Sequence, residues 1–341
     1  MKLIELHILQ SFPVSCLNRD DVGAPKSAVF GGVPRARISS QCLKRAGRLA
    51  AAEIAPHFNG IRSRFLKEPF TTALLKAGLD ETEAAKKADT ICAIFSKQDA
   101  KKPDQVTTAV YLSPGEIDQI AQAVANGDEP KKAAKKAQRL DAADIALYGR
   151  MIANDATLNV EGAAMFSHAL STHKVSNDID FYSAVDDRKG DSEDAGASMI
   201  GTLEFTSATY YRYAAINLDL LFDSAHLAQL DSAQKKAVLD AFIRATLMAV
   251  PGARKNSMNA ATLPYEVLGV LKDSGQPIQL INAFEKPVAA NGSGLADTSL
   301  SAMKTQLDSL KHIWGLQHKE ELWLTETGLE SFISKLTDHV E

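Results

Sequence analysis

Residues 15–48 read SCLNRDDVGAPKSAVFGGVPRARISSQCLKRAGR, and this stretch is the most informative part of the sequence. Glycine and proline interrupt its first half, and both residues favour turns and loops. We expect a helix to begin near Ser39 and Ser40, because serine side chains cap the free N–H groups of a first helical turn. The apolar stripe that would contact a core on this helix is Leu43, Ala46, Ala50 and Ile54.

The same stretch concentrates positive charge. It carries seven basic and two acidic residues, whereas the whole chain of 341 residues has a formal charge of −4. Phosphates bind where positive potential is concentrated, so the stretch is a candidate RNA-binding segment. Its candidate ligands are Arg19, Lys26, Arg35, Arg37, Ser39, Ser40, Gln41, Lys44, Arg45 and Arg48. Gln41, Lys44 and Arg48 share one helical face. The alternative is a solvated basic helix beside a flexible loop.

Composition and cysteine usage narrow the class of protein. An apolar content of 45% is ample for a large core. The three cysteines, Cys16, Cys42 and Cys92, form no C-x-x-C pair and are predicted to be reduced structural thiols. We find no signal-peptide pattern and no apolar run long enough to cross a membrane, so a cytoplasmic protein without a membrane partner is expected.

Hydrophobic periodicity predicts a mixed α+β fold. Strands are expected at 2–12, 160–172, 203–218, 263–271 and 277–284. Helices are expected at 69–77, 80–96, 113–126, 130–148, 231–249, 298–314 and 328–338. Residues 57–145 resemble an all-helical insertion, and residues 175–200 have the composition of a long loop or an extended hairpin. The order strand, helix, strand, strand, helix, strand favours a ferredoxin-like antiparallel sheet, the module of RNA-recognition domains.

Catalytic and metal-binding motifs are scarce. His168 and His173 are the closest histidine pair, but a separation of five on a strand directs them to opposite faces. Gly292-Ser293-Gly294 lacks the third glycine of a dinucleotide fingerprint. The remaining pair is Asp20-Asp21, which could cut RNA with a metal ion or could simply orient Arg19. We therefore expect no metal, no cofactor and no catalytic residue.

A second basic run, PKKAAKKAQR, occupies residues 130–139. If this run is one helix, Lys131, Lys135 and Arg139 share a face, with Lys132 and Lys136 beside it. A lysine-rich helix is often only a solvated face, and that alternative stays open.

Eight sequence blocks, in order, resemble the CasC family, the repeated backbone subunit of the type I-E Cascade complex in CRISPR immunity. Within the opening stretch they are SCLNRDD, FGG and RISSQ-x-LKRA-x-R. Further along they are Gly149-Arg150-Met151, residues 176–187, residues 211–218, Val250-Pro251-Gly252-Ala253 and residues 282–286. The blocks cover most of the chain outside residues 57–140 and the segment after 288.

The resemblance implies a hand-like architecture. An RRM-like palm would comprise residues 1–56, 146–174 and 203–341, helical fingers would comprise 57–145, and a thumb would comprise 175–202. Several copies would polymerise along one CRISPR guide RNA together with other Cascade subunits, and the guide would pair with target DNA. The implied wedges between bases are Met151 and Tyr182, supported by Phe181 and Ile200. The implied DNA-binding residues are Lys131, Lys132, Lys135, Lys136 and Arg139.

Two alternative functions remain open at this point. Related type III backbone subunits cut target RNA through an aspartate in a comparable loop, which would make Asp20 or Asp21 catalytic. The chain could also be an unrelated RNA-binding module. Co-purification with a nuclease-resistant RNA of regular length would separate a CRISPR backbone from such a module.

Overall fold

The computed structural model describes residues 1–184 and 199–340. The strands of its main sheet are β1 (Leu3–Ser15), β2 (Ser27–Phe30), β3 (Val33–Ile38), β6 (Ala164–Phe166), β7 (Ala169–Ser171), β8 (Asp178–Ala184), β9 (Met199–Asn217), β10 (Glu266–Lys272) and β11 (Glu320–Trp323). Their main order is β11-β10-β1-β9-β7-β3-β2, while β6 and β8 also pair with β9. All of these pairings are antiparallel.

Helices cover both faces of this sheet. They are α1 (Ser40–Ile54), α6 (Ala143–Tyr148), α7 (Leu218–Leu221), α8 (Ser232–Met248), α9 (Leu295–Trp314), α10 (Leu324–Thr327) and α11 (Leu329–Thr337). Residues of α1, α8 and α11 share one core with Ile4, Leu6 and Ile8 of β1. Met303 and Leu307 of α9 pack in a second core with Leu9. Because both faces are covered, every residue of β1 from Leu3 to Gln10 is buried.

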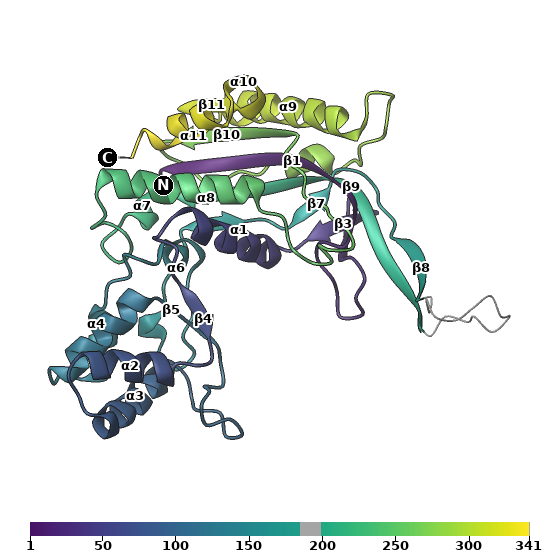
Figure 1. Cartoon of the computed structure of the whole chain (residues 1–341). Coiled ribbons are helices and arrows are strands. Elements are labelled where there is room, and N and C mark those ends of the chain that lie inside the picture. Colours follow the sequence, from purple (N-terminus) through teal and green to yellow (C-terminus); the bar gives the residue numbers. More distant parts are fainter. Residues whose placement is uncertain (185–198, 341) are drawn as a thin grey trace.

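The predicted ferredoxin-like arrangement is confirmed. Along the chain, β1 and α1 are followed by β6 and β7, then by β9, α8 and β10. β6 and β7 pair with consecutive parts of β9 and occupy the place of one strand. Counted in this way, the order is strand, helix, strand, strand, helix, strand, and β1 lies between β10 and β9 in the sheet. The sheet and its helices form the palm, which is the upper part of the molecule in Figure 1.

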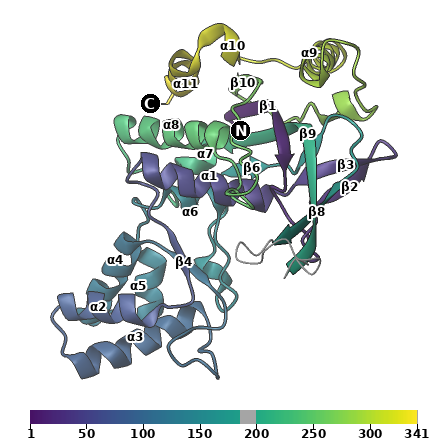
Figure 2. The same ribbon diagram turned by 45° about the vertical axis from the view of Figure 1, so that its right-hand side comes forward.

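The fingers are a separate layer below the palm (Figures 1 and 2). Their elements are β4 (Ile61–Ser63), α2 (Lys67–Lys76), α3 (Glu81–Phe95), β5 (Val110–Leu112), α4 (Pro114–Ala125), α5 (Pro130–Lys136) and a short 3-10 helix (Ala156–Leu158). A core of their own, from Leu66 to Leu158, holds them together. The expectation of an all-helical insertion is wrong, because β4 and β5 pair as a small sheet.

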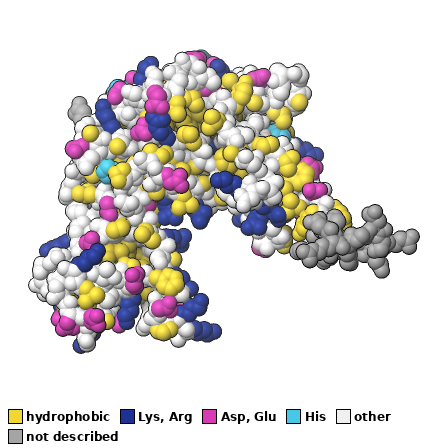
Figure 3. All heavy atoms as spheres, viewed as in Figure 1, with side chains coloured by type: hydrophobic (Ala, Val, Ile, Leu, Met, Phe, Trp, Pro, Cys, Tyr) yellow, Lys and Arg dark blue, Asp and Glu magenta, His cyan; other side chains and the backbone are white. Residues whose placement is uncertain are grey.

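The segment 175–200 contributes to an extended hairpin, one of the two predicted alternatives. β8 pairs with the first part of the long strand β9, from Asp178 opposite Phe205 to Ala184 opposite Met199. Figure 1 shows this hairpin projecting from the palm at the end away from the fingers. The space-filling view shows a hollow below the palm, between the fingers and the hairpin (Figure 3). We call the hairpin the thumb.

Three sequence expectations about elements are wrong. The predicted strand at 277–284 is not formed: residues 277–280 have no regular structure and Ile281–Phe284 is a 3-10 helix. The predicted helix at 130–148 is two helices, α5 and α6, because the chain leaves the helical conformation at Ala137. On α1 the buried residues are Leu43, Gly47 and Ala51, whereas Ile54 is exposed. The helix is rotated from the predicted stripe because small residues bring it close to α8.

Candidate nucleic-acid interface

The loop before α1 is held by two side chains: Ser39, which was predicted to bind RNA, and Asp20, for which catalysis was only an alternative. The hydroxyl of Ser39 caps α1 by accepting the Cys42 N–H at 3.3 Å, as the sequence predicted. Asp20 Oδ1 accepts the N–H groups of Val22 at 3.0 Å and Ala24 at 2.9 Å. The loop therefore has an ordered conformation, and the side chains of Ser39 and Asp20 accept backbone hydrogen bonds that stabilise it.

Arg35 is a correction to the predicted phosphate ligands. Its side chain is fully buried, and its guanidinium donates to the carbonyl oxygens of Phe30, Ser171, Phe284 and Glu285. Burial lowers the pKa of the Arg35 guanidinium. Gly31 lies beside this site, with φ of +59°, and a Cβ there would lie 1.7 Å from the Glu285 oxygen. Arg35 thus joins β3 to the segment after β10 and has no surface for RNA.

Lys44 and Arg48 lie one turn apart on α1 and are half-buried. Lys44 Nζ is 3.5 Å from the Ala164 oxygen and 5.7 Å from the centre of the Phe166 ring. Burial lowers the pKa of Lys44. The Arg48 guanidinium lies 5.2 Å from the centre of the Tyr111 ring, which belongs to the fingers. These two side chains therefore lie where α1 faces β6 and the fingers.

A groove of about 1120 Å³ runs along the opposite side of α1. Arg19 and Arg45, both exposed, line it together with Lys255 from the loop after α8. Arg254 in that loop has a positive φ of 53°, which is uncommon for a residue with a side chain. Val250-Pro251-Gly252-Ala253 is one of the blocks that resemble the CasC family, and the sequence assigned it no function. Only the fold brings the basic residues that follow it beside Arg19.

The other predicted ligands in this stretch differ in their hydrogen bonds and in their exposure to solvent. Arg37 Nε donates to the Ser27 oxygen at 3.1 Å, and its Nη1 lies 3.3 Å from His168 Nδ1. Gln41 is exposed, while Lys26 and Ser40 are partly exposed. The exposed members of the predicted set are thus Arg19, Gln41 and Arg45, and the partly exposed ones include Lys26, Ser40, Lys44 and Arg48.

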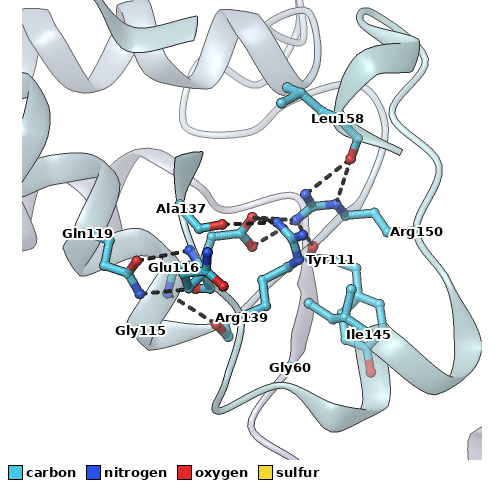
Figure 4. A network of polar contacts seen from close by, with 12 residues as sticks. Gly60, Tyr111, Gly115, Glu116, Gln119, Ala137, Arg139, Ile145, Arg150 and Leu158 are labelled. Atoms are coloured by element: carbon cyan, nitrogen blue, oxygen red, sulfur yellow. Dashed lines mark hydrogen bonds and ion pairs between the residues drawn. The ribbon is translucent and has the colours of Figure 1, made fainter. Parts of the chain in front are cut away.

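The base of the fingers contains a buried ion-pair network (Figure 4). Arg150 Nη1 donates to both carboxylate oxygens of Glu116, at 2.9 and 2.7 Å, and Arg139 Nη1 contacts Glu116 Oε1 at 3.3 Å. Arg150 also donates to the carbonyl oxygens of Leu158 and Tyr111. Directly after this anchor, Met151 is 82% exposed. An exposed apolar side chain thus follows directly after a buried ion pair.

The same network corrects the prediction for Arg139. The residue lies beyond the end of α5, and its guanidinium also donates to the carbonyl oxygens of Ala137 and Ala225. It therefore does not share a helical face with Lys131 and Lys135 and is not free to bind DNA. Lys131 pairs with Asp155 at 2.8 Å, and this pairing raises the pKa of Lys131. The exposed lysines of α5 without a side-chain partner in the described part of the chain are Lys132, Lys135 and Lys136.

The thumb exposes apolar side chains on both faces. Successive residues of a strand point to opposite faces, so Phe181 is on one face with Ile179, and Tyr182 is on the other. Phe181 is 64% and Ile179 70% exposed. The ring of Tyr182 lies over Gly201 in β9, where a Cβ would be 2.5 Å from the ring. Ile179 was missed by sequence reasoning, and the side chain of Ile200 lies outside the described residues.

Basic side chains gather around the hollow. Figure 3 shows Lys and Arg atoms along the lower side of the palm and along the edge of the fingers that faces the hollow. Among the described residues, no three His, Cys, Asp or Glu side chains are close enough to hold a metal ion. No described helix has the length and apolar character needed to span a membrane.

Comparisons with known proteins agree with this architecture. One solved chain from a "CRISPR RNA-guided surveillance complex, pre-nicking" matches with a TM-score of 0.73 and 29% identity, over 92% of this chain and 89% of that one. Another, from a "CRISPR RNA-guided surveillance complex", matches in fold with a TM-score of 0.60 and 24% identity, over 94% and 87%. No curated protein sequence matches significantly. The family model described as CT1975-like protein matches residues 4–338, so the chain belongs to the CT1975-like protein family.

Proposed function

We propose that the chain is a backbone subunit of a CRISPR RNA-guided surveillance complex and that it binds the guide RNA along the palm. The observation that carries the proposal is the set of accessible basic groups on α1 and in the groove beside it, although the whole chain is acidic. The likeness to chains of two such complexes supports it. Lysine and arginine contacts to phosphates hold an RNA strand without reading its sequence.

We infer oligomerisation from the positions of the proposed wedge residues. Met151 is at the base of the fingers, and Phe181 and Tyr182 are on the thumb. Figure 1 places fingers and thumb at opposite ends of the molecule, so one chain does not bring its own two wedges to the same base step. We infer that the thumb of one copy acts beside the fingers of the next, in a head-to-tail filament whose length the RNA sets.

We further propose that this backbone is of type I-E and presents the guide for pairing with target DNA. The eight ordered sequence blocks support the type. Specificity would come from base pairing rather than from protein contacts to bases. In this proposal the subunit is not an enzyme.

Cleavage of target RNA through Asp20 or Asp21 is the second candidate function. The contacts of Asp20 favour the non-catalytic reading, because its Oδ1 already accepts two backbone N–H groups. Asp21 is exposed and is the less constrained of the two. Metal-dependent cleavage of target RNA that is lost in Asp20→Ala or Asp21→Ala would establish this alternative.

Sedimentation of the purified chain with and without guide RNA tests the proposal. Without RNA we expect monomers or irregular aggregates, because basic surfaces of adjacent copies repel one another. With RNA we expect ordered assemblies of defined mass. Ordered filaments of equal size in both samples would contradict the proposal.

Variants locate the RNA-binding surface. Lys44→Ala and Arg45→Ala should shorten or abolish the RNA-driven assemblies, because each removes a phosphate-binding charge from α1. Lys335→Ala is the matched control, since this exposed lysine lies on α11, away from the groove. Normal assembly of both α1 variants at physiological salt would show that α1 does not hold the RNA.

A further inference from the structure

The loop between α3 and β5, residues 96–109, forms the lower edge of the fingers (Figure 1). We call it the α3–β5 loop. It carries three exposed lysines, Lys97, Lys101 and Lys102. None of these side chains has an ion pair or hydrogen bond with another described residue. The sequence analysis had assigned them no role.

Asp99 organises this loop from inside. Its Oδ1 accepts the backbone N–H groups of Lys101 at 2.8 Å and Lys102 at 3.2 Å, and its other oxygen pairs with Arg64. The Lys101 N–H is the main reason why the pKa of Asp99 is lowered. The carboxylate of Asp99 thus stabilises the backbone conformation of Lys101 and Lys102.

Further hydrogen bonds tie both ends of the loop to the fingers. The Asp99 N–H donates to Gln105 O at 2.9 Å, and the Gln105 N–H donates to Lys102 O at 2.9 Å. Val106 exchanges hydrogen bonds with Arg64, through its N–H at 2.9 Å and its carbonyl oxygen at 2.7 Å. The lysines therefore project from a backbone that is already ordered, and binding would not have to order it.

The loop also lies beside further positive charge. Arg62 is exposed on the adjacent strand β4, which pairs with β5. Arg64 and Asp99 form an ion pair and neutralise each other. The other charged residues of the loop and Arg62 are four cations and one acid, Asp104, which sum to +3. Figure 3 shows Lys and Arg atoms along this edge of the fingers, across the hollow from the palm.

We propose that the α3–β5 loop is a second nucleic-acid surface, which contacts the phosphate backbone of duplex DNA. The loop contains lysines but no aromatic residue, and surfaces that bind single strands usually add aromatic side chains on which bases stack. Lysines act as point charges that hold phosphates without reading bases. This surface is distinct from the groove on α1 and from the lysines of α5.

Salt-dependent DNA binding tests the proposal. The variant Lys97→Ala/Lys101→Ala/Lys102→Ala and the control Lys76→Ala/Lys86→Ala/Lys335→Ala lose the same charge from exposed positions. Guide-loaded assemblies of each are titrated with duplex DNA unrelated to the guide. If three phosphate contacts are lost, the log–log salt slope of the loop variant should flatten by about 2.7 per engaged copy, at roughly 0.9 per contact. The control should keep the slope of the unmodified chain.

The outcomes separate this surface from the proposed guide binding. Normal guide loading with a flattened slope supports the loop as a duplex surface. Equal slopes in both triple variants would overturn it, and so would normal duplex binding combined with failed guide loading. Failure of guide loading in the unmodified chain would contradict the proposed function alone, since duplex binding by the free protein can still be measured.

A single substitution tests whether the conformation of the α3–β5 loop, in addition to its charge, contributes to binding of duplex DNA. Asp99→Ala makes the surface more positive by one charge but removes the acceptor that fixes Lys101 and Lys102. If the ordered backbone presents the lysines, this variant should bind duplex DNA more weakly than the unmodified chain at the same salt concentration. Equal or stronger binding, with an unchanged Tm, would overturn the presentation by an ordered loop.

Discussion

Arg35 and Arg45 lie ten residues apart in one basic stretch but have opposite surroundings. Arg35 is enclosed by backbone carbonyl oxygens, whereas Arg45 lines an open groove. A buried cation survives only where hydrogen-bond acceptors replace water, and the four carbonyl oxygens around Arg35 do so. The residue type alone therefore does not distinguish a structural arginine from one that binds phosphate.

This difference predicts opposite phenotypes. Arg35→Ala should lower the free energy of unfolding by about 3 kcal/mol or more, because it leaves buried carbonyl oxygens without donors. Arg37→Ala on the same strand, whose side chain is partly exposed, should cost less than about 1 kcal/mol. Denaturant unfolding measures both. A stable Arg35→Ala variant that has lost RNA binding would restore Arg35 as a phosphate ligand.

The thumb is a two-stranded hairpin whose exposed ring depends on its partner strand. Gly201 leaves the space in which the Tyr182 ring lies, and aromatic rings commonly cover glycines across a strand pair. Ile179 and Phe181 occupy the opposite face and are exposed. The element therefore presents two different apolar surfaces rather than one.

We predict that Gly201→Ala displaces the Tyr182 ring without unfolding the palm, since the new Cβ would overlap the ring. Guide-loaded assemblies of this variant should form normally but bind target DNA more weakly, because a wedge is misplaced. Stacking contacts of this kind contribute about 1–3 kcal/mol, which corresponds to about a five- to 150-fold change in Kd. Tyr182→Phe is the control and should retain affinity. Equal affinities for Gly201→Ala and the unmodified chain would show that the ring's position is unimportant.

The palm as a whole encloses a polar cluster between the sheet and α9. His7 Nδ1 lies 2.9 Å from the Tyr211 hydroxyl, and Glu5 pairs with Lys272 at 2.7 Å, all of them buried. Burial lowers the pKa of His7, although Glu5 opposes this effect. The imidazole is therefore expected to be neutral in the folded protein at neutral pH.

A pH dependence of stability follows from this burial. Between the lowered folded-state pKa of His7 and its ordinary value of 6.5, the unfolded chain binds more protons than the folded chain. Stability should thus fall as pH drops below about 6.5, by at most about 1.4 kcal/mol per pH unit for this group. The measurement is Tm from pH 7.5 to 5.5, and His7→Gln should show a smaller decrease. His173 and His318, whose pKa values burial also lowers, should leave a residual slope in that variant. Parallel curves for both proteins would exclude His7 as the source.

Local sequence features predicted much of the fold. Patterns of neighbouring residues predicted three features: the Ser39 cap, the helix after the acids at 80–83 and the strand at 2–12. Each lies where predicted. Capping and hydrophobic periodicity act between residues close in the chain, so they are visible in the sequence. The order of these elements was enough to indicate the ferredoxin-like sheet.

Contacts between distant segments were not visible in this way. Three of the four acceptors around Arg35 come from residues more than 130 positions away, and the groove beside Arg45 is completed by Lys255. Arg139 looked like part of a lysine-rich helix until the fold paired it with Glu116. Basic composition and local spacing determined where a nucleic-acid surface could lie. Which charges are buried and which face the hollow depends on packing between segments far apart in the chain, because burial and hydrogen-bond partners are properties of the assembled core.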